Sequence, residues 1–276
     1  MIKQIARRVR KEVLFTVRRA KGKANSGYCT ICDRKVLFVE MGPWLRDEYL
    51  CARCGSIPRQ RALIKVLNDQ FPGWRELRIH ESSPGGPSSD KIVRECRGYV
   101  ASQFFPNIPR GQFNGSQRSE DLERLTFGDE SFDIALTQDV FEHVLRPAKG
   151  FAEIARTLKP GGAHVYTVPY YRGKQTVIRA EPDEAGGIRH VLPPDYHNNP
   201  IDATGSLVIT EWGDELCDFI FRACGMTTTI FNFYDPRLGL KGEFLDVLIS
   251  RKAAGEHLLR GRAEVVGRVA QVGDGA

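Results

Sequence analysis

Four cysteines near the start of the chain have the spacing of a metal site. Cys29 and Cys32 form one Cys-x2-Cys pair, Cys51 and Cys54 form a second, and eighteen residues separate the pairs. Each pair presents two thiolates from one tight turn, and a hairpin can bring both turns around one tetrahedral ion. Gly55 is free to make the turn after the second pair. The spacing predicts a structural zinc ribbon, because four thiolates leave no position open for substrate; disulfide bonds are the alternative.

A second set of residues is suited to proton transfer. Asp139 and His143 are four residues apart, so on a helix they would share a face, where the carboxylate can orient the imidazole to remove a proton from a substrate. His197 lies in a polar and aromatic part of a long loop. We interpret Asp139, His143 and His197 as candidate catalytic residues; a structural role for His143, or a His197 that only bonds the backbone, is the alternative. Glu142 and Arg146 are expected to form a surface ion pair.

The long loop, residues 170–210, contains several prolines and glycines. A loop of about forty residues in a compact domain is more often a functional lid than a passive connector. The side chains in and beside it that are suited to contact a substrate are Tyr170, Tyr171, His190, Asp195 and Tyr196.

The elements that must position these residues alternate between strands and helices. Hydrophobic patterning predicts strands at 77–80, 99–102, 132–137, 163–168, 227–233 and 244–250. It predicts helices from Ser56-Ile57-Pro58 to Phe71, at 141–158 with a kink at Pro147, and at 212–223. Strands separated by helices indicate an α/β fold with a mostly parallel sheet covered on both faces, and the last two strands are expected to be antiparallel.

Charge is unevenly distributed along the chain. The 276 residues carry a net charge of +6, but residues 1–24 alone hold nine basic side chains and one acid, so the remainder is slightly negative. Apolar residues recur at helical spacing within the basic stretch (Ile2, Ile5, Val9 and Val13). Such a basic amphipathic helix can pack on its own protein, lie on an anionic membrane or bind nucleic acid. The chain has seven cysteines, four of them in metal-binding spacing, which fits a reducing compartment. We therefore expect a cytoplasmic protein, with peripheral membrane contact as an option.

The central stretch contains three motifs in a fixed order. It reads Asp-Leu-x-x-Leu-x-Phe-x-Asp-x-Ser-Phe-Asp at 121–133, Glu-His-Val at 142–144 and Leu-Lys-Pro-Gly-Gly at 158–162. Together they closely resemble the class I S-adenosylmethionine-dependent methyltransferases, in particular the type-11 group, over roughly residues 75–250. The resemblance implies a Rossmann-like seven-stranded methyltransferase sheet with its last strand antiparallel. The expected organisation is a basic helix (1–24), a zinc ribbon (25–60), a methyltransferase domain (61–250) with a substrate lid (170–210), and a tail (251–276).

The resemblance also implies an S-adenosylmethionine site beyond the carboxyl ends of the strands. The family's glycine-rich loop corresponds to residues 81–87, although Ser83 stands at its first glycine and Pro87 at its third. The acid that grips the ribose at the end of the second strand is replaced here by Ser102 or Gln103. The implied cofactor-binding residues are Glu81, Ser83, Gly85, Gly86, Ser102, Gln103, Asp121, Leu122 and Thr137.

Three functions remain open from the sequence. The first is methylation of a small molecule or glycan, on oxygen. The second is methylation of RNA, with the ribbon and the basic start holding the phosphates. The third is a non-catalytic methyltransferase fold that binds a partner, which the altered first loop and the missing ribose acid favour. We expect zinc removal to destabilise the ribbon and to leave the larger sheet folded.

Overall fold

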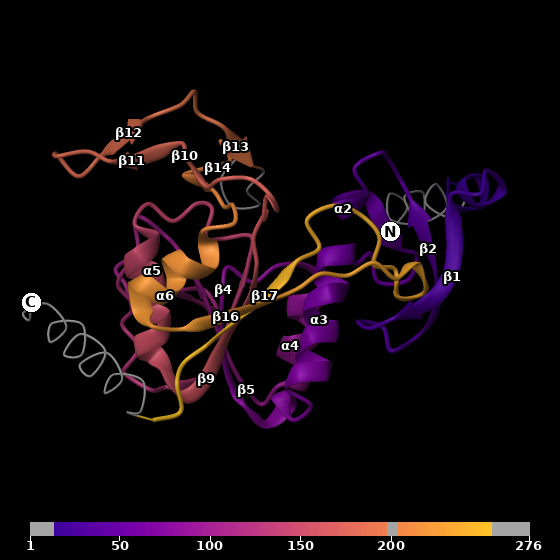
Figure 1. The fold of residues 1–276 in the computed structure, drawn as a ribbon. Coiled ribbons are helices and arrows are strands. Elements are labelled where there is room, and N and C mark those ends of the chain that lie inside the picture. Colours follow the sequence, from indigo (N-terminus) through magenta and orange to yellow (C-terminus); the bar gives the residue numbers. More distant parts are fainter. Residues whose placement is uncertain (1–13, 198–203, 256–276) are drawn as a thin grey trace, which may run out of the picture.

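The computed structural model describes residues 14–197 and 204–255, and its centre is an eight-stranded sheet (Figure 1). The strand order is β16-β17-β9-β8-β4-β5-β7-β6. The strands are β4 (Arg78–Ser82), β5 (Gly98–Gln103), β6 (Phe113–Asn114), β7 (Gln117–Ser119), β8 (Phe132–Gln138), β9 (Leu158–Thr167), β16 (Thr227–Phe231) and β17 (Val247–Arg251).

The sheet is parallel from β7 to β9, and β17 runs antiparallel to both of its neighbours. The predicted α/β fold is therefore confirmed, including the antiparallel last strand. The predicted number of seven strands is corrected to eight, because the short edge strand β6 forms a hairpin with β7.

Helices cover both faces of the sheet (Figure 1). On one face, α3 (Pro58–Gln70) packs beside α4 (Gly86–Glu95) and contacts β9 and β17. On the other face, α5 (Pro147–Thr157) packs against α6 (Leu216–Cys224). Two buried hydrophobic clusters result, one on each face, as expected for an open sheet between two helical layers.

Two predicted helices are shorter than the sequence pattern suggested. The helix predicted at 141–158 begins only at Pro147, because the chain leaves β8 in a left-handed turn at Asp139 (φ 52°) and continues through bends. The helix predicted at 212–223 begins at Leu216. Earlier in the chain, α3 begins at Pro58 as expected, but Ile57 rather than Ser56 is its N-cap residue.

The cysteine-containing segment forms a small antiparallel sheet of β1 (Ala24–Cys29), β2 (Arg34–Glu40) and β3 (Tyr49–Cys51), with a one-turn helix α2 (Leu45–Glu48) between the last two. Its buried side chains belong to the same hydrophobic cluster as α3 and the central strands. Gly27 lies so close to the 3-10 helix η2 (Pro236–Leu238) that a Cβ there would meet the Arg237 carbonyl oxygen at 2.1 Å. The ribbon is thus packed onto the main domain through continuous apolar contact.

The predicted lid is an arm of two-stranded ladders above the carboxyl edge of the sheet (Figure 1). Its strands are β10 (Val177–Ile178), β11 (Ala180–Pro182), β12 (Ile188–His190), β13 (Tyr196–His197), β14 (Ser206–Leu207) and β15 (Thr210–Glu211).

Two of the segments predicted from the sequence, at the two ends of the chain, lie largely outside the described residues. Most of the basic amphipathic pattern (1–13) and nearly all of the tail (256–276) lie outside the described residues, while residues 14–20 are helical.

A short 3-10 helix, η1 (Trp74–Glu76), precedes β4. No helix within the described ranges is both long and apolar enough to cross a membrane.

Candidate functional site

The carboxyl ends of β4 and β8 both lead into strained backbone. Ser83, directly after β4, has a φ of 56°, and Asp139, directly after β8, has a φ of 52°. Non-glycine residues rarely adopt this left-handed region, and such residues concentrate at functional sites. Ser83 occupies the position where the methyltransferase family has a glycine. A glycine suits this position because it adopts a positive φ without steric cost.

Three chain segments meet at this edge and are joined by backbone hydrogen bonds. The Ser83 N–H donates to the Ser102 carbonyl (2.8 Å), which links the loop after β4 to the end of β5. The Glu120 N–H donates to the Gln103 carbonyl (3.0 Å), which links β5 to the segment that contains Asp121. One Asp121 carboxylate oxygen accepts the Glu123 N–H (2.9 Å), and Leu122 beside it is buried. Ser83, Gln103 and Asp121 are therefore held at neighbouring strand ends.

Glu81 is fully buried in a polar network below the loop. Its carboxyl group accepts hydrogen bonds from Ser89 Oγ (2.7 Å), Tyr99 Oη (2.8 Å) and Gln138 Nε2 (2.8 Å). Burial raises the pKa of Glu81, and the three donors partly offset this. The same network holds the start of α4, where Gly85 N–H donates to Ser89 Oγ. Glu81 therefore fixes the shape of the loop that carries Gly85 and Gly86.

Two of the predicted cofactor-binding residues face the core instead. Ser102 Oγ shares a hydrogen bond of 2.8 Å with the buried His80, and Thr137 Oγ1 shares one of 3.0 Å with the buried His164. Both histidines are neutral, because burial, followed by a nearby basic group, lowers their pKa to about 3. The alternation of side chains along a strand places the Ser102 and Thr137 hydroxyl groups on faces of the sheet that are covered by the core. A cofactor contact from the side chain of Ser102 or Thr137 therefore stays a prediction that this arrangement does not favour.

Asp139 forms two ion pairs, one with the ribbon and one with α3, and its side chain is 15% exposed. Arg46 Nη2 lies 2.7 Å and Arg59 Nε 3.2 Å from the same carboxylate oxygen, while Thr167 Oγ1 donates to the other oxygen (2.8 Å). Burial alone would raise the pKa of Asp139, but the two guanidinium groups hold it well below its usual value. Asp139 consequently remains an anion held by arginines. The predicted pairing of Asp139 with His143 on one helix face is wrong, since residues 139–143 are not helical.

His143 and His197 converge on Glu142, beside the strand end that Asp139 follows. The two imidazole rings meet edge to face with centroids 5.1 Å apart. Glu142 Oε1 lies 3.8 Å from His143 Nε2 and 4.0 Å from His197 Nδ1. Burial, followed by the charge of Asp139, raises the pKa of Glu142, and burial lowers the pKa of His143. The predicted surface ion pair between Glu142 and Arg146 is wrong, since Glu142 is 1% exposed and Arg146 pairs with Glu123.

The predicted substrate residues of the lid divide into three kinds. Tyr171, Asp195 and His197 surround a small hollow with Glu142, Pro169, Val208, Thr210 and Glu211. Tyr170 is instead buried in the helical layer, where its hydroxyl donates to Asp214 (2.9 Å), and it does not line this hollow. His190 and Tyr196 are exposed on the arm.

Sequence reasoning missed Arg46, Arg59 and the buried position of Glu142. Arg46 is 93 residues from Asp139 along the chain, and no local pattern indicates such a contact. For Glu142 a signal existed, because it directly precedes His143 in the Glu-His-Val motif.

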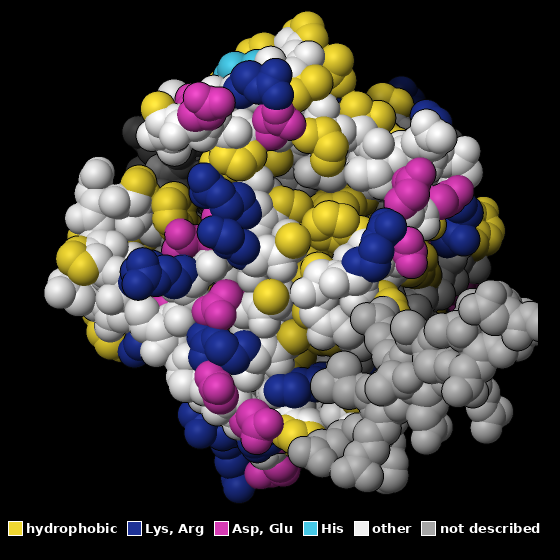
Figure 2. Space-filling view, turned by 60° about the vertical axis from the view of Figure 1, so that its left-hand side comes forward, with side chains coloured by type: hydrophobic (Ala, Val, Ile, Leu, Met, Phe, Trp, Pro, Cys, Tyr) yellow, Lys and Arg dark blue, Asp and Glu magenta, His cyan; other side chains and the backbone are white. Residues whose placement is uncertain are grey.

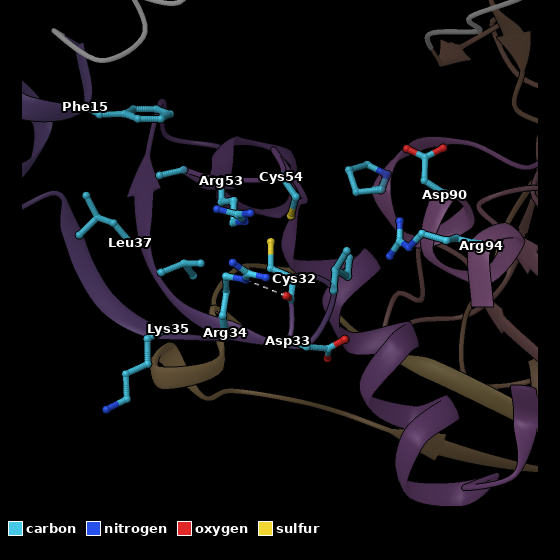
Figure 3. A pocket seen from close by; sticks show the side chains of 14 residues that line it. Phe15, Cys32, Asp33, Arg34, Lys35, Leu37, Arg53, Cys54, Asp90 and Arg94 are labelled. Atoms are coloured by element: carbon cyan, nitrogen blue, oxygen red, sulfur yellow. Dashed lines mark hydrogen bonds between the residues drawn. The ribbon is translucent and has the colours of Figure 1, made fainter.

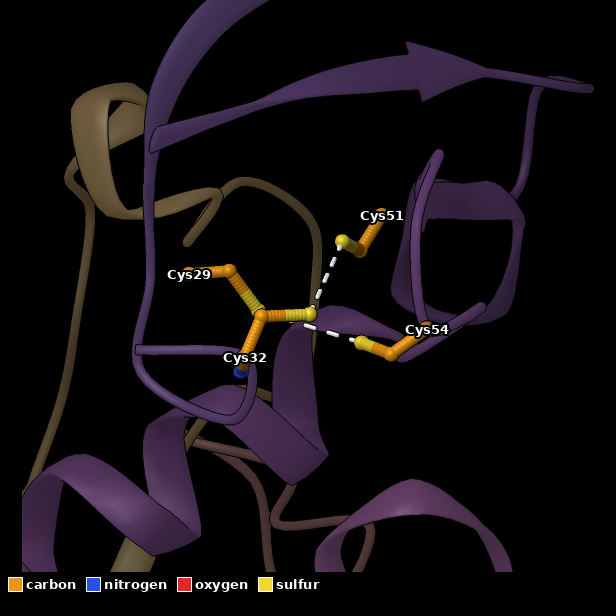
Figure 4. Close-up of side chains that lie close together, drawn as sticks. All are labelled: Cys29, Cys32, Cys51 and Cys54. Atoms are coloured by element: carbon orange, nitrogen blue, oxygen red, sulfur yellow. Dashed lines mark hydrogen bonds between the residues drawn. The ribbon is translucent and has the colours of Figure 1, made fainter. Parts of the chain in front are cut away.

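The four predicted metal ligands form one cluster (Figure 4). Cys29 Sγ lies 3.9 Å from Cys54 Sγ, and Cys32 Sγ lies 3.8 Å from Cys51 Sγ. Sulfurs about 2.3 Å from one tetrahedral zinc ion are separated by about 3.8 Å, whereas a disulfide requires about 2.05 Å. The sulfurs therefore fit a tetrahedral ion and exclude the disulfide alternative in this arrangement.

A second hollow lies between the ribbon and α4 (Figure 3). It has a volume of about 1040 Å³, and its charged lining contains Arg34, Lys35, Arg53 and Arg94 against Asp33 and Asp90. Its wall includes Cys32 and Cys54 of the ribbon on one side and Pro87 and Asp90 from the start of α4 on the other.

Residues 99–166, from β5 to β9, match a family model described as a methyltransferase domain. The predicted resemblance to class I methyltransferases is thereby confirmed, and the matched stretch contains Asp121, Asp139, Glu142 and His143.

Individual proteins that resemble this chain are distant in sequence. The chain is 32% identical to a demethylmenaquinone methyltransferase of Clavibacter sepedonicus, over 38% of this chain and 49% of the relative, so it spans about half of that protein's length. Among solved structures, an S-adenosylmethionine-dependent methyltransferase from Mesorhizobium loti is 17% identical over 69% of this chain and 98% of its own, with a TM-score of 0.46. The 1,6-didemethyltoxoflavin-N1-methyltransferase of Burkholderia thailandensis is 18% identical over 71% and 78%, with a TM-score of 0.42.

Proposed function

We propose that the protein is an S-adenosylmethionine-dependent methyltransferase that methylates an oxygen of a small molecule or glycan. The observation that carries the proposal is the match of residues 99–166 to a methyltransferase domain. It is supported by the convergence of Ser83, Gln103 and Asp121 at one edge of the sheet. The demethylmenaquinone methyltransferase relative, by its name, acts on a small molecule, which favours this class of acceptor.

The residues at the carboxyl edge fit the cofactor in chemical terms. Asp121 uses one carboxylate oxygen for the Glu123 N–H, and its other oxygen is suited to accept from an adenine amino group. Gln103 supplies an amide where hydroxyl groups of a ribose would lie. Gly85 has no atom within 4 Å of where a Cβ would lie, which leaves space for close approach to a ligand. The cofactor, when bound, supplies an electrophilic methyl group on a sulfonium.

The chain's own contribution to the reaction is alignment, exclusion of water and handling of the acceptor proton. The arm over the carboxyl edge is positioned to cover an acceptor, and its Ile209 and Thr210 N–H groups both donate to the Glu142 carbonyl. A hydroxyl acceptor must lose its proton during methylation, and we propose that the cluster of Glu142, His143 and His197 assists this loss.

Calorimetric titration with S-adenosylmethionine and with its demethylated product tests the cofactor site. We expect micromolar binding, weakened tenfold to hundredfold in Asp121→Ala, since a hydrogen bond to a charged group contributes about 1.5–3 kcal/mol. Asp129→Ala is the matched control, because Asp129 is an exposed acid of the same stretch that pairs with Arg156. Failure of the folded protein to bind either compound would sink the proposal and favour the non-catalytic, partner-binding alternative.

We further propose that the four cysteines hold a structural zinc ion, which implies a reducing, cytoplasmic location. Serine and arginine side chains support the thiolates: the Ser56 hydroxyl lies 3.2 Å from Cys54 Sγ, and the positive charge of the buried Arg61 is close by. Metal analysis of purified protein is expected to find one zinc per chain, lost in Cys32→Ser.

The hollow beside the ribbon favours RNA as a second candidate acceptor. Its four basic side chains outnumber its two acids, and phosphate contacts of this kind weaken with salt. By contrast, the face in Figure 2 intersperses basic and acidic groups instead of separating them by sign. Salt-dependent retention of RNA that is lost in Arg34→Gln/Arg53→Gln would support this candidate, and salt-independent retention would exclude it.

A further inference from the structure

We propose that Glu142, His143 and His197 bind a divalent first-row transition-metal ion, separate from the cysteine site, at the carboxyl edge of the sheet. The placement of this ion beside the acceptor, and hence its role, rests on the methyltransferase function proposed above. The binding itself rests only on the geometry of the three side chains.

The first observation is the unsatisfied carboxylate of Glu142. Its side chain is 2% exposed, and neither of its oxygens has a hydrogen-bond partner among the described residues. A buried carboxylate without a partner is costly, and buried charges are normally paired or coordinate a metal. This carboxylate is therefore an anionic ligand that lacks a cation.

The second observation is the orientation of His143. Its Nδ1 lies 2.8 Å from the carbonyl oxygen of Leu207, and because a carbonyl can only accept, Nδ1 carries the proton. The lone pair is consequently on Nε2, the nitrogen that faces Glu142. Metal-binding histidines are typically fixed in this way, by donating their other ring N–H to a carbonyl or carboxylate.

The third observation is that the three ligand atoms are close together. Each residue offers one ligand atom, and these atoms all lie within 4.8 Å of one another. Ligands about 2.1 Å from one cation can be up to about 4.2 Å apart, so the distances of 3.8 Å and 4.0 Å from Glu142 already fit. His197 is the exposed member of the cluster, and a small movement of its ring completes the set.

No cation forms an ion pair or hydrogen bond with the Glu142 carboxylate among the described residues other than the two histidines. The guanidinium groups of Arg46 and Arg59 act on Glu142 without contacting it, because both are bound to Asp139. A protonated, neutral Glu142 is the competing account, and it predicts no metal binding.

The ligand chemistry selects the kind of ion. Two imidazoles and one carboxylate suit Mn²⁺, Fe²⁺, Co²⁺ or Zn²⁺, and three protein ligands leave positions open. Those positions would face the hollow that Tyr171, Asp195 and Glu211 line. A hydroxyl group of the acceptor that coordinates there would lose its proton more readily, which would aid methylation on oxygen.

Electron paramagnetic resonance of Mn²⁺ provides a test that does not depend on activity, because bound Mn²⁺ loses the signal of the free ion. We titrate zinc-loaded, full-length protein with Mn²⁺, and separately with Co²⁺ followed by absorption. One bound equivalent is expected, weakened at least tenfold in Glu142→Gln, His143→Ala and His197→Ala. His190→Ala, an exposed histidine of the same arm, is expected to bind like wild type.

Retention of zinc by the cysteines reports that each variant is folded. Absence of a bound Mn²⁺ or Co²⁺ equivalent in wild type, or binding that all three variants retain, would overturn the proposal. Metal binding without any methyl transfer would leave the site standing and contradict the proposed function. Cofactor binding and methyl transfer by zinc-loaded protein that binds neither Mn²⁺ nor Co²⁺ would contradict the second metal site and leave the proposed function standing.

Discussion

Ser83 adopts a left-handed backbone conformation that the family's glycine would adopt without strain. The conformation is imposed by its place between β4 and α4, where its N–H is bonded to β5. The Ser83 side chain makes this conformation more costly than it would be for glycine, so the loop after β4 stores backbone strain.

At this residue we expect Ser83→Gly to leave the free energy of unfolding unchanged or to raise it by up to about 1 kcal/mol, since the left-handed conformation costs a serine roughly 1–2 kcal/mol. The control Ser131→Gly, at an ordinary φ, is expected to lower it by about 0.5–1 kcal/mol. Urea denaturation of both variants measures the difference, and equal destabilisation would contradict the argument.

Asp139 gives the protein a specific acid sensitivity. Its pKa is lowered in the folded state from about 3.9 in the unfolded chain. A group with a lowered folded-state pKa adds stability above its unfolded pKa, and this stability is lost as the pH falls through the folded pKa.

We therefore expect the free energy of unfolding to fall more steeply below about pH 4 in wild type than in Asp139→Asn. The variant is expected to be less stable by about 3 kcal/mol at pH 7, because two arginines lose their anion. Urea denaturation from pH 7 down to acid conditions tests both points, and parallel pH curves for the two proteins would refute them.

Helix α3 is the element that joins the ribbon to the sheet. Its Arg61 is fully buried and donates to three carbonyl oxygens: Tyr49 in the ribbon, Ser56 before the helix and Gly239 near the end of the domain. The guanidinium group thus connects segments from both ends of the chain.

Arg61→Met is expected to lower the free energy of unfolding by about 3–5 kcal/mol, because three buried carbonyls lose their donors. Lys65→Met on the same helix removes a surface pair with Asp69 and a cation–π contact with Phe233 and is expected to cost about 1 kcal/mol. Chemical denaturation measures the free energy of unfolding of both variants. An equal loss in the two would show that the hydrogen bonds of Arg61 do not stabilise the fold.

At the scale of the whole molecule, the ribbon and the sheet share one hydrophobic cluster. Cys29, Cys51 and Phe38 belong to the same buried set as Ile134 and Val165 of the central strands. The sequence led us to expect that the sheet would stay folded after zinc removal from the ribbon. The shared hydrophobic cluster argues against such independence of the two parts.

We now expect chelation of zinc to destabilise both parts together, because loss of the ribbon exposes one side of α3 to water. Hydrogen exchange measured by mass spectrometry, on peptides from β1–β3 and from β8–β9, tests this in one sample. Faster exchange in both sets is the expected result, whereas faster exchange in the ribbon peptides alone would restore the two-module picture.

The sequence by itself determined the features that local spacing encodes. These are the cysteine pairs, the alternation of strands and helices, and the motifs from Asp121 to Gly162, since periodicity and turn residues act over a few positions. The tertiary structure alone decided the environment of the site. It turned Ser102 and Thr137 into the core, brought Arg46 to Asp139, and buried Glu142 beside two histidines. Such contacts join segments far apart in the chain, and they depend on which face each strand end presents, which no local pattern records.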